Sequence, residues 1–91
     1  SSGDRSIRYG AAVEALEVGP AAKDGVPSLL AMLRDADADH RTMGAAALGR
    51  IGPPASRAVP VLIDLAAKDT SEWVRAAACE AVSVATPTVA Q

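Results

Sequence analysis

The side chains best suited to catalysis or metal binding are few in this chain and lie far apart along it. His40 is the only histidine and Cys79 the only cysteine. A catalytic thiol needs a neighbouring base, and a transition-metal site needs several imidazole or thiolate ligands. One residue of each kind supplies neither set, and a single cysteine cannot form an internal disulfide. The sequence therefore predicts no catalytic residue, no cofactor and no metal, and it gives no sign of an oxidising compartment.

Charged side chains form the other patterns that could carry chemistry. Asp35, Asp37 and Asp39 alternate like the first ligands of a calcium loop, but the loop glycine and terminal glutamate of that motif are missing. No glycine-rich phosphate loop is present. The net charge of −2 gives no basic field for a phosphate backbone. We therefore expect neither calcium nor double-stranded nucleic acid as a ligand.

Three arginines recur at one position of an internal repeat. Arg41 follows Arg8 by 33 positions and Arg75 follows Arg41 by 34, each within a similar alanine-rich stretch. A second repeated pattern, Gly-Pro followed by Val-Pro, begins at Gly19 and again at Gly52, also 33 positions apart. A period of this length is typical of a solenoid, in which small helical units stack and present a surface.

The elements that position these residues are predicted to be helices. Apolar residues make up 49% of the chain and aromatic residues only 2%, so the core must consist of small aliphatic side chains, which suits closely packed helices. Gly-Pro pairs end two helices, and Asp24 and Ser71 are expected to cap the starts of two others. These starting and ending residues predict five helices, at about 4–18, 24–35, 39–51, 55–68 (or from 56) and 72–85 (or to 86).

Helical spacing predicts one buried apolar stripe on each helix, with residues at i, i+3, i+4 and i+7. In the first, third and fifth helices the stripe is expected to comprise Ala11, Ala12, Ala15 and Val18, then Gly44, Ala45, Leu48 and Ile51, then Ala78, Cys79, Val82 and Ala85. In the second and fourth helices it is Val26, Leu29, Leu30 and Leu33, then Val59, Leu62, Ile63 and Ala66. We therefore expect Cys79 to be buried and inert.

The remaining distinctive side chains have structural as well as functional interpretations. His40 occupies the position of Ile7 and Val74 in the other units, so it is expected to be partly packed at a helix start. Tyr9 and Trp73 are large enough to anchor a partner. For Trp73, however, we expect that the ring covers the edge between repeats.

The run from His40 to Gly52 resembles a HEAT repeat, with Val-Arg replaced by His-Arg, paired alanines, and the Ala-Leu-Gly and Ile-Gly steps, followed by Ala-Val-Pro at Ala58–Pro60. It is similar to the short bacterial and archaeal HEAT-like repeats first noted in phycobilisome lyases. The resemblance covers residues 7–85, although the first unit carries Ala15 where the family has leucine and the third lacks the Ile-Gly ending. It implies a right-handed α-solenoid whose second helices line the concave side.

The expected fold is thus an all-α superhelix of about two and a half HEAT-like helical hairpins. We expect a flexible start or cloning scar over residues 1–5, the first repeat at 6–38, the second at 39–70, the first helix of a third at 71–86 and a tail at 87–91. The flank of the last helix that bears Ala81 and Val84 is expected to have no following unit to meet. That end, around Val82, is therefore predicted to self-associate or to continue into further repeats.

The resemblance also implies a non-catalytic scaffold with a protein or peptide partner. The candidate partner-binding face consists of second-helix residues, namely Ser28, Ala31, Asp35, Val61, Asp64 and Lys68. In the family, acidic and basic residues form a stacked ladder between units, and the candidates here are Arg8, Arg41, Arg75, Asp35 and Asp69. We expect no membrane segment and a cytoplasmic, bacterial setting.

Three alternative functions are weaker on sequence grounds. A nucleic-acid-binding module of the DNA-repair type needs a basic face, and Lys68 is the only base on the candidate face. A bilin lyase-like subunit is suggested by the family name, but no chromophore site can be identified. A designed repeat is disfavoured because the units differ from one another at many positions.

Overall fold

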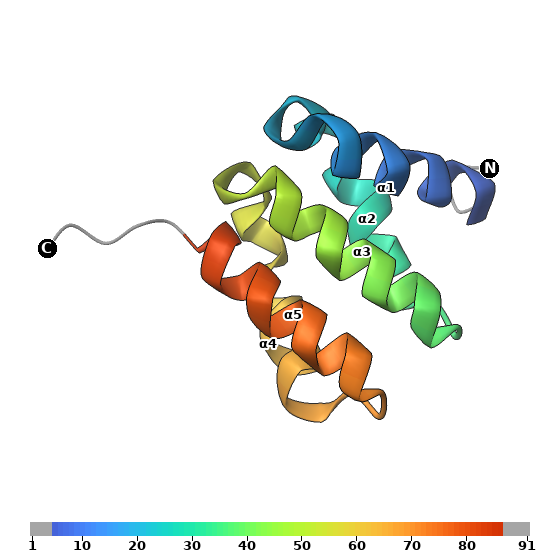
Figure 1. Ribbon diagram of the computed structural model, residues 1–91, viewed down its shortest axis with the longest axis vertical. Helices are drawn as coiled ribbons and strands as arrows, with labels where there is room; N and C mark the ends of the chain where they lie inside the picture. Colours follow the sequence, from blue (N-terminus) through green and yellow to red (C-terminus); the bar gives the residue numbers. More distant parts are fainter. Residues whose placement is uncertain (1–4, 87–91) are drawn as a thin grey trace, which may run out of the picture.

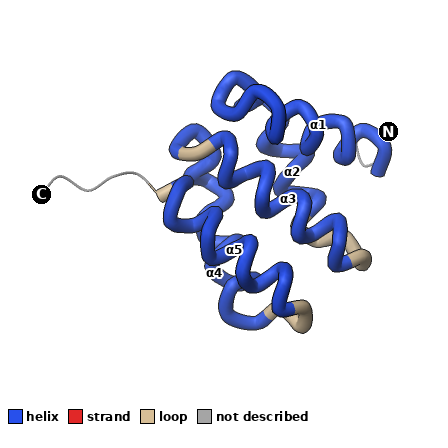
Figure 2. The backbone as a smooth tube through the Cα atoms, viewed as in Figure 1, coloured by secondary structure: helices blue, strands red, loops and turns tan. Residues whose placement is uncertain are grey.

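The structure, a computed structural model, describes residues 5–86 of the chain. Its α-helices are joined by short loops and by 3-10 segments, and this part of the chain contains no strand (Figure 2). The elements, in order, are α1 (Arg5–Val18), η1 (Gly19–Gly25), α2 (Val26–Met32), α3 (Ala38–Ile51), η2 (Pro53–Ala58), α4 (Val59–Lys68) and α5 (Glu72–Ala85). The predicted all-α class is confirmed, whereas the expectations for residues 1–4 and 87–91 lie outside the described residues.

The helices form two layers. α1, α3 and α5 lie side by side in one layer, and α2 and α4 lie behind them (Figure 1). The central helix, α3, contacts α1 on one side and α5 on the other, while α2 packs against α1 and α3, and α4 packs against α5. Each unit therefore consists of a first helix in the front layer and a second helix behind it, as the internal repeat predicts.

Two glycines end the first helices, and 3-10 segments precede the second ones. Gly19 and Gly52 have φ angles of 60° and 79°, a region that favours glycine, so the helix stops there. The segments η1 and η2 that follow are 3-10 helices, each interrupted by one non-helical residue, Ala22 and Ala55. The prediction that the fourth helix starts as an α-helix at residue 55 or 56 was therefore wrong.

The predicted bounds of the second helix were also wrong at both ends. α2 begins at Val26 with Gly25 as its N-cap residue, and no side chain caps it, so Asp24 does not have the predicted role. The kink within η1 keeps the backbone at Asp24 out of the α-helix. At the other end, the amides of Arg34 and Asp35 bond to carbonyls three residues back, which closes the helix as a 3-10 turn. By contrast, the hydroxyl of Ser71 caps α5 as expected.

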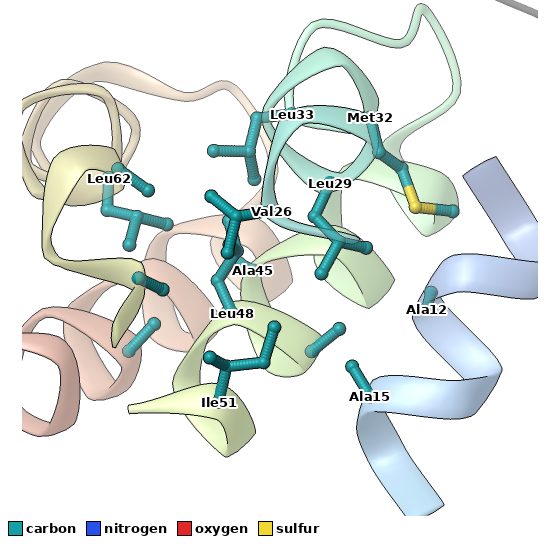
Figure 3. Packing of buried hydrophobic residues seen from close by; sticks show 14 of the residues in the cluster. Ala12, Ala15, Val26, Leu29, Met32, Leu33, Ala45, Leu48, Ile51 and Leu62 are labelled. Carbon is teal, nitrogen blue, oxygen red and sulfur yellow. The ribbon is translucent and has the colours of Figure 1, made fainter. Parts of the chain in front are cut away.

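The core lies between the two layers and consists of aliphatic side chains (Figure 3). No polar or charged residue of the described chain is buried. The largest fully buried side chains are Leu29, Met32, Leu33, Leu48, Ile51, Leu62 and Val74. Most residues of the predicted apolar stripes belong to this core, but Val18 and Ile63 are about half exposed.

Candidate partner-binding surfaces

A groove of about 600 Å³ crosses the front layer of helices, lined by α1, α3 and α5. Its deepest residues are small, because Ala45 and Ala81 line it and are fully buried. Half-exposed Val18 and Val84 stand at its edges. The other lining residues are Leu16, Glu17, Gly19, Ala46, Gly49, Arg50, Ala77 and Glu80. The groove therefore offers an apolar floor with charged groups around it.

The floor of this groove depends on a close approach of two helices. A Cβ atom at Gly49 would lie 3.2 Å from the Cα atom of Ala81, closer than ordinary van der Waals contact. This approach buries Ala81 against α3 of the preceding unit, so Ala81 does not belong to the flank predicted to lack a following unit. Sequence reasoning assigned the partner to the second helices and therefore missed the groove. The repeated small residues of the first helices were the available signal.

The predicted partner-binding face lies on the back layer, where its residues differ in availability. On α2, Ala31 is exposed and Ser28 is partly buried. On α4, Asp64 and Lys68 are exposed and form an ion pair of 3.3 Å with each other, while Val61 packs partly against the core. The sixth member, Asp35, has a side chain only 5% exposed because it is held in ion pairs described below.

Arg41 binds Asp69 within its own unit and the backbone of the preceding unit. The Nε and Nη2 atoms of Arg41 donate to the two carboxylate oxygens of Asp69 at 2.9 and 3.1 Å. Its Nη1 atom donates to the backbone carbonyls of Asp35 and Ala36 at 2.8 and 3.0 Å. Arg41 therefore joins the loop that ends the first unit to the loop that ends the second. The fork geometry lowers the pKa of Asp69, chiefly through the hydrogen bonds from Arg41.

The first unit makes the equivalent contact with two arginines. Arg8 lies 3.6 Å from Asp35, while Arg5 donates two hydrogen bonds of 2.9 Å to the same carboxylate. The hydrogen bonds from Arg5, followed by that from the amide of Asp37, lower the pKa of Asp35 to about 2. Arg5 was not predicted as a ladder residue, although it lies three positions before Arg8 and so on the same helix face.

The family model described as HEAT repeats matches residues 1–83 of the sequence. This chain belongs to the HEAT-repeat family. Neither the comparison with curated proteins nor the comparison with solved structures finds a match. Arg8, Arg41 and Arg75, which recur in the sequence, lie on α1, α3 and α5 respectively.

Cys79 and Trp73, both on α5, are more exposed than the sequence predicts. Cys79 is exposed, although the equivalent residues Ala12 and Ala45 are fully buried. The reason is that a following unit buries those alanines, and no following unit lies over Cys79 in the described chain. Trp73 is 74% exposed and so does not cover an edge between repeats.

The histidine of the second HEAT repeat is partly packed, as predicted. The ring of Tyr9 meets that of His40 edge to face, with centroids 6.4 Å apart. The Nδ1 atom of His40 lies 3.0 Å from Nη2 of Arg5 and 3.4 Å from the carboxylate of Asp37. No group of three or more metal-binding side chains is found among residues 5–86. Within the same range, no helix has the length and apolar character needed to cross a membrane.

Proposed function

We propose that this HEAT-repeat chain is a non-catalytic interaction module that binds a protein segment in the groove across α1, α3 and α5. The observation that carries the proposal is the groove itself, because its volume of about 600 Å³ and its small apolar floor suit inserted aliphatic side chains. Right-handed stacking of about two and a half repeats, as the family resemblance implies, would extend that surface across all three first helices.

The charges around the groove indicate the chemistry of the segment. Glu17 and Glu80 carry negative charge there, against one positive charge on Arg50, and all three residues are exposed. A ligand with aliphatic residues beside a lysine or arginine would complement both the floor and these charges. The back-layer face, with exposed Ala31, is the alternative surface for the same function.

Peptide selection with matched variants tests this proposal. Peptides selected from a random displayed library on the wild-type protein should combine aliphatic residues with a basic residue. Ala46→Arg places a long cationic side chain at an exposed position of the groove, so binding of these peptides should fall at least about tenfold. Ala31→Arg makes the same change on the back layer and should leave binding unaltered. Loss of binding in Ala31→Arg alone would move the site to the back-layer face.

A further inference from the structure

Trp73 lies on the same face of α5 as the residues that line the groove. The lining residues of α5 are Ala77, Glu80, Ala81 and Val84, which follow Trp73 by 4, 7, 8 and 11 positions. These spacings return to one side of an α-helix. The indole ring therefore stands where the groove continues along α5, one turn before the first lining residue.

The exposure of Trp73 is a property of its place in the front layer. The side chain is 74% exposed. Asp39 of α3 precedes Arg41 by two positions, as Trp73 precedes Arg75, so Asp39 and Trp73 are equivalent. α3 is packed between α1 and α5 (Figure 1), and Asp39 is nevertheless exposed. A front-layer helix with neighbours on both sides therefore leaves this position open to solvent.

The surroundings of the ring favour a positively charged ligand group. Glu80 lines the groove about two turns beyond Trp73 on the same face, and its side chain is exposed. The turn between them carries Ala76 and Ala77, whose methyl groups leave the space between the ring and the carboxylate open to a ligand. Asp39 adds an exposed carboxylate on the neighbouring helix.

The positive charge of the groove lies at its other end. Arg50 is the one base among the lining residues, and it follows Arg41 by nine positions, as Val84 follows Arg75. Arg50 is therefore equivalent to Val84, the lining residue of α5 furthest from Trp73. A cation near Trp73 meets carboxylates without meeting Arg50.

The chemistry and the dimensions of this end of the groove define the group that fits it. A guanidinium stacks flat on an indole ring and donates paired hydrogen bonds to a carboxylate, which the ammonium of a lysine cannot do. From Trp73 to Ala81 on the groove floor the helix rises by about 12 Å, a distance that an extended chain covers in about three or four residues.

We propose that Trp73 and Glu80, the arginine subsite, bind an arginine of the partner segment about three or four residues from the aliphatic side chain that fills the groove. The guanidinium stacks on the ring of Trp73 and donates hydrogen bonds to the carboxylate of Glu80. This inference rests on the proposed function, because the groove must hold the segment. It adds which basic residue is recognised and which side chains recognise it.

Two peptides that differ in one charge test the subsite. Peptides without tryptophan are selected on the wild-type protein from a random displayed library, and the tightest is compared with a copy in which citrulline replaces arginine. We expect arginine enriched at the stated spacing from an aliphatic residue, and binding that changes the fluorescence of Trp73, the only tryptophan of the protein. The citrulline peptide should bind about fivefold more weakly or worse.

Protein variants assign that weakening to the ring. Trp73→Leu keeps an apolar side chain but removes the ring, so the arginine peptide should lose about fivefold in affinity while the citrulline peptide loses little. Tyr9→Leu removes a half-exposed ring that does not line the groove, and it should preserve the difference between the peptides. Circular dichroism checks that both variants keep the helical fold.

The outcomes separate the subsite from the groove. Selected peptides without arginine, peptides with an apolar residue at that spacing in its place, or equal losses of both peptides in Trp73→Leu would overturn the arginine subsite while the groove stands. Failure to select any peptide, or binding that Ala46→Arg leaves unaltered, would refute the groove and the subsite together.

Discussion

Asp69 shows how the side chain and backbone of one residue can together join three helices. Its carboxylate accepts hydrogen bonds from Arg41 of α3 and from the amide of Ser71, while its carbonyl accepts one from Arg75 of α5. Its own amide bonds to Leu65 at the end of α4. A glutamate would place the carboxylate one methylene further from the backbone and could not reach both the following amide and the arginine as well. The residue type is therefore set by geometry and not only by charge.

Replacement of Arg41 should lower the stability of the whole domain. Arg41→Met keeps much of the aliphatic length but removes the fork that binds Asp69, whose side chain is only 5% exposed. A partly buried carboxylate without its partner costs about 2 kcal/mol, and urea denaturation should show a loss of that size in the free energy of unfolding. Arg57→Met, at an exposed position, should stay within about 0.5 kcal/mol of wild type. Equal effects of the two changes would contradict the ladder interpretation.

The ladder carboxylates should make the domain sensitive to acid. The pKa values of Asp35 and Asp69 are lowered by hydrogen bonds from Arg5 and Arg41, that of Asp35 to about 2. A carboxyl with a lowered pKa stabilises the folded state above its ordinary value near ~3.9, and the stabilisation disappears as the pH falls through the folded value. The urea midpoint should therefore drop between about pH 4 and pH 2.

Asparagine variants identify the carboxyl groups responsible for that drop. The double variant Asp35→Asn and Asp69→Asn should be less stable at neutral pH and should show a flatter pH profile. A profile as steep as that of the wild type would assign the acid sensitivity to other groups.

At the scale of elements, the sequence predicts the helices of the front layer better than those behind. The bounds of α3 and α5 differ from prediction by no more than one residue, because glycine, proline and capping residues mark their ends. α2 and α4 are preceded by 3-10 segments that proline and alanine permit but that no residue type dictates. Choice between an α- and a 3-10 turn depends on packing against the neighbouring helix, which local sequence does not contain.

Two glycines should respond in opposite ways to added side chains. A side chain at Gly49 meets the backbone of Ala81, so Gly49→Leu should push α3 and α5 apart and cost about 2 kcal/mol. A Cβ atom at Gly10 meets nothing within 4 Å, so Gly10→Ala should stabilise α1 by about 0.5–1 kcal/mol through helix propensity. Thermal unfolding followed by circular dichroism measures both, and a stabilising Gly49→Leu would show that the two helices are not tightly packed.

For the whole molecule, the HEAT-repeat family was predicted correctly but the coverage of the last helix was not. Register places Cys79 with Ala12 and Ala45, yet only the alanines are buried. Burial in a stacked array depends on whether a neighbour is present, and equivalent positions at an end lack one. Sequence patterns could not reveal the groove either, since its lining residues come from three helices that are far apart in the sequence.

The distribution of positive charge over the whole molecule predicts no binding of double-stranded DNA at physiological salt. Non-specific DNA affinity requires several arginine or lysine side chains free to neutralise phosphates together. In the described chain, Arg5 and Arg41 are committed to aspartates and Lys68 pairs with Asp64. The net charge of −2 opposes approach to DNA as well. An electrophoretic mobility shift at micromolar protein should therefore show no complex in ~150 mM salt, whereas a shift that survives this salt would favour a nucleic-acid ligand over a protein partner.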